Sequence, residues 1–172
     1  MVFKKASVFP DYLAVRSRKF NSSLKKEYAM PIRHAEAQWN GTLKRGSGTV
    51  AIKSIGLKAD YSFSSRFEEG NGTNPEELLG AAHAGCFSMA LSGVLEKAGF
   101  TPDSIATKAN VTVELVGNGF KITAIKLICR AKVLGIDQAQ LNVHANAAKT
   151  GCPVSVALSN VPITLEATLE KS

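Results

Sequence analysis

Residues 74–91 read NPEELLGAAHAGCFSMAL, and this stretch predicts the central element of the fold. Asn74 is a favourable helix N-cap, and Pro75 fits the first helical position, where its missing N–H has no consequence. Few polar residues interrupt the run up to Lys97, and Gly99 is expected to end the helix. We therefore expect a helix that is apolar on nearly every face and buried at the centre of the protein.

The segments on either side of this helix are typical of strands and short helices. Apolar and polar residues alternate in the predicted strands, and the turn at Asn40-Gly41 is a strong hairpin signal. The predicted strands are residues 33–40, 48–55, 59–67, 105–116, 120–134 and 163–169. Two further helices are expected at residues 137–149 and 153–159. The order βββ-α-ββ-α-α-β predicts an α+β fold rather than a doubly wound sheet.

Composition limits the class of protein. A chain of 172 residues, 45% of them hydrophobic, is long enough for one domain with a substantial core. We expect no membrane-spanning segment, which takes roughly 18 apolar residues. Three cysteines are too few for a secreted disulfide scaffold, and no signal peptide is recognised. A reducing, cytoplasmic location is therefore expected, where paired cysteines tend to be catalytic or metal-binding.

The net charge of +7 is concentrated at the N-terminus. Residues 1–29 hold seven basic and two acidic residues, so they carry five of the seven net charges. We interpret them as a basic extension to a domain at residues 30–172. The extension could come from an early start codon or added residues, or it could be a structural arm. A nucleic-acid or targeting role is a third alternative, although basic arms are usually just solvated.

Two of the three cysteines lie in settings that suit thiol chemistry. Cys152 directly precedes a proline and is predicted to be the N-cap of a helix, whose N-terminus stabilises a thiolate. Cys86 lies within the apolar helix, where burial disfavours a thiolate. A lone buried cysteine is more often a core residue than a catalyst. Cys129, on a predicted strand with no partner motif, is interpreted as a core residue.

The stretch from Gly72 to Leu91, with Gly151-Cys152-Pro153-Val154-Ser155, resembles the family of osmotically inducible protein C (OsmC) and organic hydroperoxide resistance (Ohr) proteins. Residues 35–41 and 99–102 match as well, and the similarity covers roughly residues 31–171. The Ala-Ala-His-Ala before the first cysteine is closer to the OsmC branch. The resemblance implies an antiparallel sheet packed on a buried central helix. It also implies an intertwined homodimer whose active sites draw residues from both chains.

The same resemblance implies a peroxidase that reduces organic hydroperoxides without haem, flavin or metal. By position, Cys86 is the peroxidatic cysteine, Cys152 the resolving cysteine and Glu76 the active-site glutamate. Arg66 is the first choice for the active-site arginine, and Arg45 is the alternative. The implied reductant is a dithiol, typically a protein-bound lipoyl group.

The chemistry of these residues agrees with such roles. A buried Cys86 thiolate needs a cation that stays charged when buried, which arginine does better than lysine. That arginine needs a carboxylate partner, and Glu76 is the obvious candidate. Ten residues of straight helix, however, separate Glu76 from Cys86 by about 15 Å. Either the helix breaks, with Gly80 as the expected place, or an arginine from elsewhere bridges the two residues.

Other interpretations remain open. His83 could assist the thiol, although a hydrogen-bonded buried histidine is the favoured interpretation. The cysteine pair could serve a non-enzymatic redox-sensing or binding protein. Metal binding by the two cysteines and a histidine has little support, because the spacing of structural zinc sites is missing. No nucleic-acid or membrane partner is expected, since the charge outside residues 1–29 is ordinary.

Overall fold

The computed structural model describes residues 32–170, so the predicted extension at residues 1–29 lies outside it. All helices and strands belong to the unit that begins at Ala35. They are β1 (Glu36–Asn40), β2 (Ser47–Ile52), the short 3-10 turn η1 (Lys53–Ile55), β3 (Leu57–Ser62), α2 (Phe63–Phe67), α3 (Pro75–Lys97), β4 (Pro102–Val116), β5 (Gly119–Val133), α4 (Gln138–Gly151), α5 (Pro153–Ala157) and β6 (Ile163–Leu169). The predicted α+β class is confirmed.

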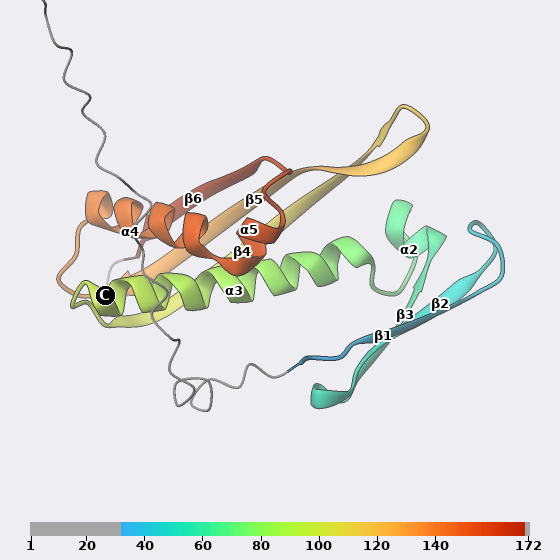
Figure 1. Cartoon of the computed structure of the whole chain (residues 1–172), viewed down its shortest axis with the longest axis horizontal. Coiled ribbons are helices and arrows are strands. Elements are labelled where there is room, and N and C mark those ends of the chain that lie inside the picture. The colour runs from blue at the N-terminus through green and yellow to red at the C-terminus, as the bar shows by residue number, and fades with distance from the viewer. Residues whose placement is uncertain (1–31, 171–172) are drawn as a thin grey trace, which may run out of the picture. The chain divides into compact units, whose positions relative to one another are not determined.

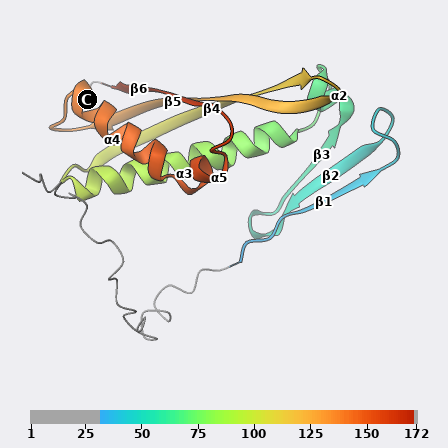
Figure 2. The same ribbon diagram turned by 45° about the horizontal axis from the view of Figure 1, so that its top comes forward.

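The strands form two sheets of three (Figure 1). β1, β2 and β3 make an antiparallel meander. β4 and β5 form a long antiparallel hairpin, and β6 joins β5 in parallel, which the sequence did not predict. A parallel neighbour requires a crossover, and α4 and α5 supply it between β5 and β6. Figure 2 shows α3 and α4 on the same face of the second sheet.

The core lies between this sheet and the two helices. Residues at spacings of three and four along α3 point inward, and the α3 core residues Phe87, Leu91 and Leu95 are fully buried. They pack with Leu127 of β5 and Leu141 of α4 in one hydrophobic cluster. Burying each such side chain contributes about 1.5–3 kcal/mol. Cys129 belongs to the same cluster, which confirms its interpretation as a core residue.

The ends of α3 are as the sequence predicted. The Asn74 side chain accepts a hydrogen bond of 2.8 Å from the Glu77 backbone N–H, and Pro75 occupies the first turn. At the other end Gly99 has a φ of +87°, which favours glycine, and the Phe100 N–H donates to the Leu95 carbonyl. These caps explain why both boundaries could be predicted from local sequence alone.

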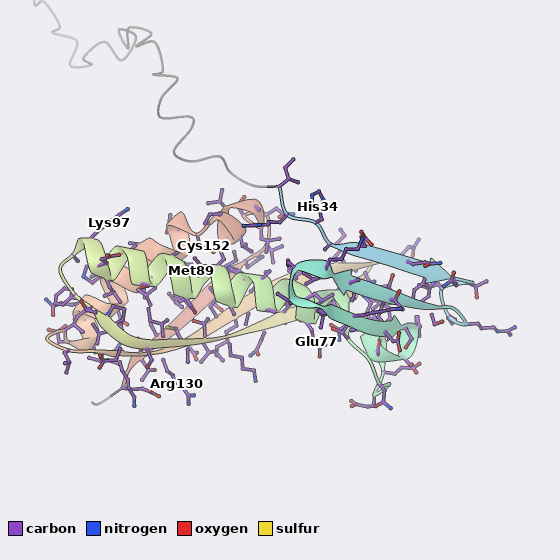
Figure 3. All side chains as sticks on the ribbon, turned by 90° about the horizontal axis from the view of Figure 1, so that it is seen from below. His34, Glu77, Met89, Lys97, Arg130 and Cys152 are labelled. Carbon is purple, nitrogen blue, oxygen red and sulfur yellow. The ribbon has the colours of Figure 1, made fainter. Side chains whose placement is uncertain are left out.

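The expectation that α3 is buried on all sides is wrong. Its outer face is apolar but open, with Ala81, Ala82 and Gly85 exposed and Met89 79% exposed (Figure 3). The expectation about membrane-spanning segments also needs correction, because α3 is long and apolar enough to cross a membrane by length and composition alone. Core helices of soluble proteins meet the same criterion, and α3 carries the buried polar residues Glu76 and His83.

The predicted strand at 59–67 is also wrong in its second half, because residues 63–67 form helix α2. Ser62 and Ser65 form a capping box, in which each side chain accepts from the other residue's backbone N–H. This local hydrogen bonding starts a helix immediately after β3 and places Arg66 in its last turn.

Candidate active site

The structure brings Cys86 and Cys152 together. Cys86 lies in the middle of α3, and Cys152 lies at the junction of α4 and α5, as the predicted N-cap of α5. Their sulfur atoms are 3.1 Å apart and joined by a thiol-to-thiol hydrogen bond. A disulfide bond is about 2.05 Å long, so the pair is a reduced dithiol that needs only a small movement to close.

The two thiols differ in access. Cys152 is completely buried, whereas Cys86 is only partly buried and borders the open face of α3. Figure 3 labels Cys152 in the segment beside α3. A molecule arriving from solvent therefore reaches Cys86 before Cys152.

The two thiols also differ in acidity. Burial raises the pKa of Cys86, and donation of its proton toward Cys152 raises it further. Burial alone would also raise the pKa of Cys152, but hydrogen bonds outweigh it and the net shift is downward. The donors are the Ser155 backbone N–H, the Cys86 thiol, the Ser155 hydroxyl and the Val154 N–H. Within this chain Cys152 is therefore the more acidic of the two thiols.

Arg66 and Glu76 form an ion pair between α2 and α3. The Arg66 Nη2 lies 2.7 Å from Glu76 Oε1, and its Nε lies 3.1 Å from Oε2. The Glu76 side chain is 8% exposed and that of Arg66 32%. Such a two-pronged pair holds the guanidinium in a fixed orientation.

The ion pair and the dithiol do not meet within one chain. α3 runs without a break from Pro75 to Lys97, so the predicted break at Gly80 is wrong. A side chain there would come within 3.3 Å of the Ala109 carbonyl, so glycine serves the close approach of α3 to β4. Cys86 consequently lies about 15 Å along the helix from Glu76. The alternative arginine, Arg45, is exposed in the turn between β1 and β2.

An apolar pocket of about 220 Å³ adjoins the ion pair. β1, β3 and α2 supply most of its wall, and Trp39 and Tyr61 pack there with their ring centroids 5.1 Å apart. Arg66 lines the same pocket, so one side of the guanidinium faces an apolar space. The complete lining is Trp39, Leu43, Tyr61, Ser62, Phe63, Arg66, Phe67 and Pro75.

Sequence reasoning did not assign a role to Ser155, which lies one turn after Cys152. Its hydroxyl is 2.9 Å from Nε2 of His83, and both side chains are buried. The favoured interpretation of His83 as a hydrogen-bonded buried histidine is confirmed. The signal was present in Cys-Pro-Val-Ser, but only the packing of α5 on α3 shows that this serine reaches the histidine. Among residues 32–170, no group of three His, Cys, Asp or Glu side chains is placed to hold a metal ion.

Comparisons with known proteins agree with this arrangement. The profile of a family described as OsmC-like protein matches residues 68–166. Peroxiredoxin OsmC of Escherichia coli (strain K12) is 52% identical over 132 residues, which cover 76% of this chain and 92% of that protein. An organic hydroperoxide resistance protein of Xanthomonas axonopodis pv. citri is 34% identical over 98 residues, 56% and 67% of the two chains.

The crystal structure of the organic hydroperoxide resistance protein OhrB of Bacillus subtilis has the same fold. It matches with a TM-score of 0.63 at 26% identity, over 78% of this chain and 98% of that one. The match to the E. coli protein is longer and has the higher identity, which agrees with the OsmC branch suggested by Ala-Ala-His-Ala. The family profile, these relatives and the shared fold show that this chain belongs to the OsmC family.

Proposed function

We propose that this chain is a cysteine-based peroxidase that reduces organic hydroperoxides in oxidative defence. The observation that carries the proposal is the pair of sulfur atoms 3.1 Å apart, one of them reachable from solvent. The names of its relatives, a peroxiredoxin and organic hydroperoxide resistance proteins, support the same activity.

Access assigns the two cysteines their roles. The Cys86 thiolate attacks the terminal peroxide oxygen, so an S–O bond forms and the O–O bond breaks. Cys86 becomes a sulfenic acid, and the alkoxide that leaves takes up a proton to become the alcohol. Cys152 then attacks the Cys86 sulfur, forming the disulfide and releasing the hydroxyl group as water. An external dithiol reduces the disulfide by thiol exchange and is itself oxidised to a disulfide.

A second copy of the chain supplies the missing cation in this proposal. Position 81 is midway between positions 76 and 86, so a two-fold axis beside Ala81 would place Glu76 of one α3 opposite Cys86 of the other. Ala81, Ala82 and Gly85 are small and exposed, which allows two helices to approach closely. The guanidinium of Arg66, held by Glu76, would then stabilise the Cys86 thiolate and orient the peroxide.

The apolar pocket beside Arg66 supports a bulky organic substrate. Its aromatic walls would bury the hydrocarbon part of a hydroperoxide while the guanidinium binds the peroxide oxygens. Hydrogen peroxide has no such group to bury and should be a poorer substrate. For the reductant we propose a dithiol such as a lipoyl group, and for the location the cytoplasm, where both thiols stay reduced between turnovers.

Single-cysteine variants test the proposal. With dihydrolipoamide as reductant, Cys86→Ser should abolish consumption of cumene hydroperoxide, and Cys152→Ser should permit at most one turnover. Cys129→Ser, in the core away from the pair, is the matched control and should keep the activity. Full activity of Cys86→Ser would overturn the assignment. A folded protein that forms the disulfide without turning over any hydroperoxide would instead support a redox sensor.

A further inference from the structure

The hydrogen bond between His83 and Ser155 has no role in the cycle described so far. Both residues are buried, His83 completely and Ser155 with 6% of its surface exposed. Removing two polar side chains from water is unfavourable even when they bond to each other. Neither group is needed to fill space, because apolar residues of similar size would pack there. The pair therefore calls for a functional explanation.

Ser155 connects this histidine to the dithiol. Its hydroxyl lies 2.9 Å from His83 Nε2 and also hydrogen-bonds to the Cys152 sulfur, which is 3.1 Å from the Cys86 sulfur. The result is a chain of four groups, from His83 through Ser155 and Cys152 to Cys86. Its two ends lie three residues apart on α3, and its middle comes from α5 and the junction before it.

The direction of these hydrogen bonds follows from the imidazole. Burial lowers the pKa of His83, so the ring is neutral and carries one proton. Nδ1 has no hydrogen-bond partner within residues 32–170, and a buried N–H without an acceptor is rare. The proton therefore belongs on Nε2, which donates to the Ser155 oxygen. The Ser155 hydroxyl is then free to donate its own proton to the Cys152 sulfur.

We propose that His83 is a positioning residue that acts through the Ser155 hydroxyl to hold Cys152 as a hydrogen-bonded thiolate aimed at Cys86. The titratable groups that face Cys152 in this cluster are Cys86 and His83, both from α3. The groups that α5 contributes, the Ser155 hydroxyl and the backbone N–H groups, are uncharged. Stabilisation of the thiolate inside the chain thus comes from oriented dipoles.

This inference rests on the proposed function and specifies its second step. A Cys152 thiolate attacks the sulfur of the Cys86 sulfenic acid, the S–S bond forms, and the S–O bond breaks. The hydroxide that leaves takes a proton from solvent to become water. A thiolate that is already ionised closes the disulfide quickly, which protects Cys86 from a second oxidation to sulfinic acid.

The test measures the acidity of Cys152 without any peroxide. In a Cys86→Ser/Cys129→Ser background, Cys152 is the remaining cysteine, and the serine hydroxyl introduced at position 86 keeps a hydrogen-bond donor beside it. The ultraviolet absorbance of the thiolate is titrated against pH, with the variant that also carries Cys152→Ser subtracted. Ser155→Ala and His83→Leu should each raise the midpoint by about one pH unit, a tenfold loss of thiolate below the midpoint.

Two further variants separate this role from a structural one. His83→Gln retains an N–H donor and should keep the midpoint near that of the background. His144→Leu, a histidine of α4 that packs against Phe100, is the matched control and should not shift it. Unchanged midpoints in folded Ser155→Ala and His83→Leu proteins would overturn the proposal. So would a His83→Gln midpoint equal to that of His83→Leu.

A second measurement links the titration to the cycle. With Cys86 restored and one equivalent of hydroperoxide added, His83→Leu should form the disulfide about tenfold more slowly and accumulate more sulfinic acid by mass spectrometry. An unchanged rate of disulfide formation would overturn the positioning role. If the unmodified protein consumes no hydroperoxide, the proposed function fails, but the thiolate titration still reports on His83.

Discussion

Glu76 and Cys86 lie on the same helix, and each meets a partner from a different element. Cys86 meets Cys152 from the crossover, which completes a dithiol within the chain. Glu76 meets Arg66 from α2, which completes an ion pair within the chain. The two pairs lie about 15 Å apart on a rigid helix, so neither can act on the other in a single copy. The comparison shows that redox chemistry and charge stabilisation are built separately and must be combined by assembly.

Removing the cation should give the largest effect on this comparison. Arg66→Met should lower kcat/KM for cumene hydroperoxide by about 100-fold, the usual range for loss of a preorganised charge. Oxidation by diamide should still close the Cys86–Cys152 disulfide, because the dithiol needs no arginine to form. Arg130→Met, which removes an exposed arginine paired with Glu170, is the matched control and should leave kcat/KM unchanged. A loss of activity in Arg45→Met but not in Arg66→Met would transfer the role to Arg45.

Mixing two inactive proteins sharpens the comparison further. Co-expressed Cys86→Ser and Arg66→Met chains should recover about a quarter of the unmodified activity, since half of the dimers are mixed and each has one intact site. Steady-state peroxidase assays of the purified mixture measure this recovery. Activity equal to the sum of the separate variants would mean that the cation and the thiol act within one chain.

A charge on the open face of α3 tests the assembly itself. Met89→Glu should raise the dissociation constant of the dimer by about tenfold or more, because two carboxylates would lose water in the interface. Analytical ultracentrifugation measures the constant. Val143→Glu, at a similarly exposed apolar position on α4, is the control and should not change it. Equal dissociation constants for Met89→Glu and the unmodified chain would exclude this face as the interface.

Local sequence signals predicted the elements whose ends depend on neighbouring residues. Asn74, Pro75 and Gly99 define α3, and Cys152 with Pro153 marks the start of α5, because caps act over one helical turn. The strand expected at residues 59–67 failed where a capping box between two serines starts α2. Apolar alternation continues through that segment, so periodicity alone could not reveal the change.

The sequence by itself determined the cysteine pair, the glutamate and the helix that carries two of these three residues, since these are properties of residue type and short-range order. Only the tertiary structure decided that α3 is straight, that Cys86 and Glu76 are consequently separated, and that one face of α3 stays open. It also decided that Ser155 links His83 to Cys152. Each of these results depends on packing between elements far apart in the chain, which no local pattern records.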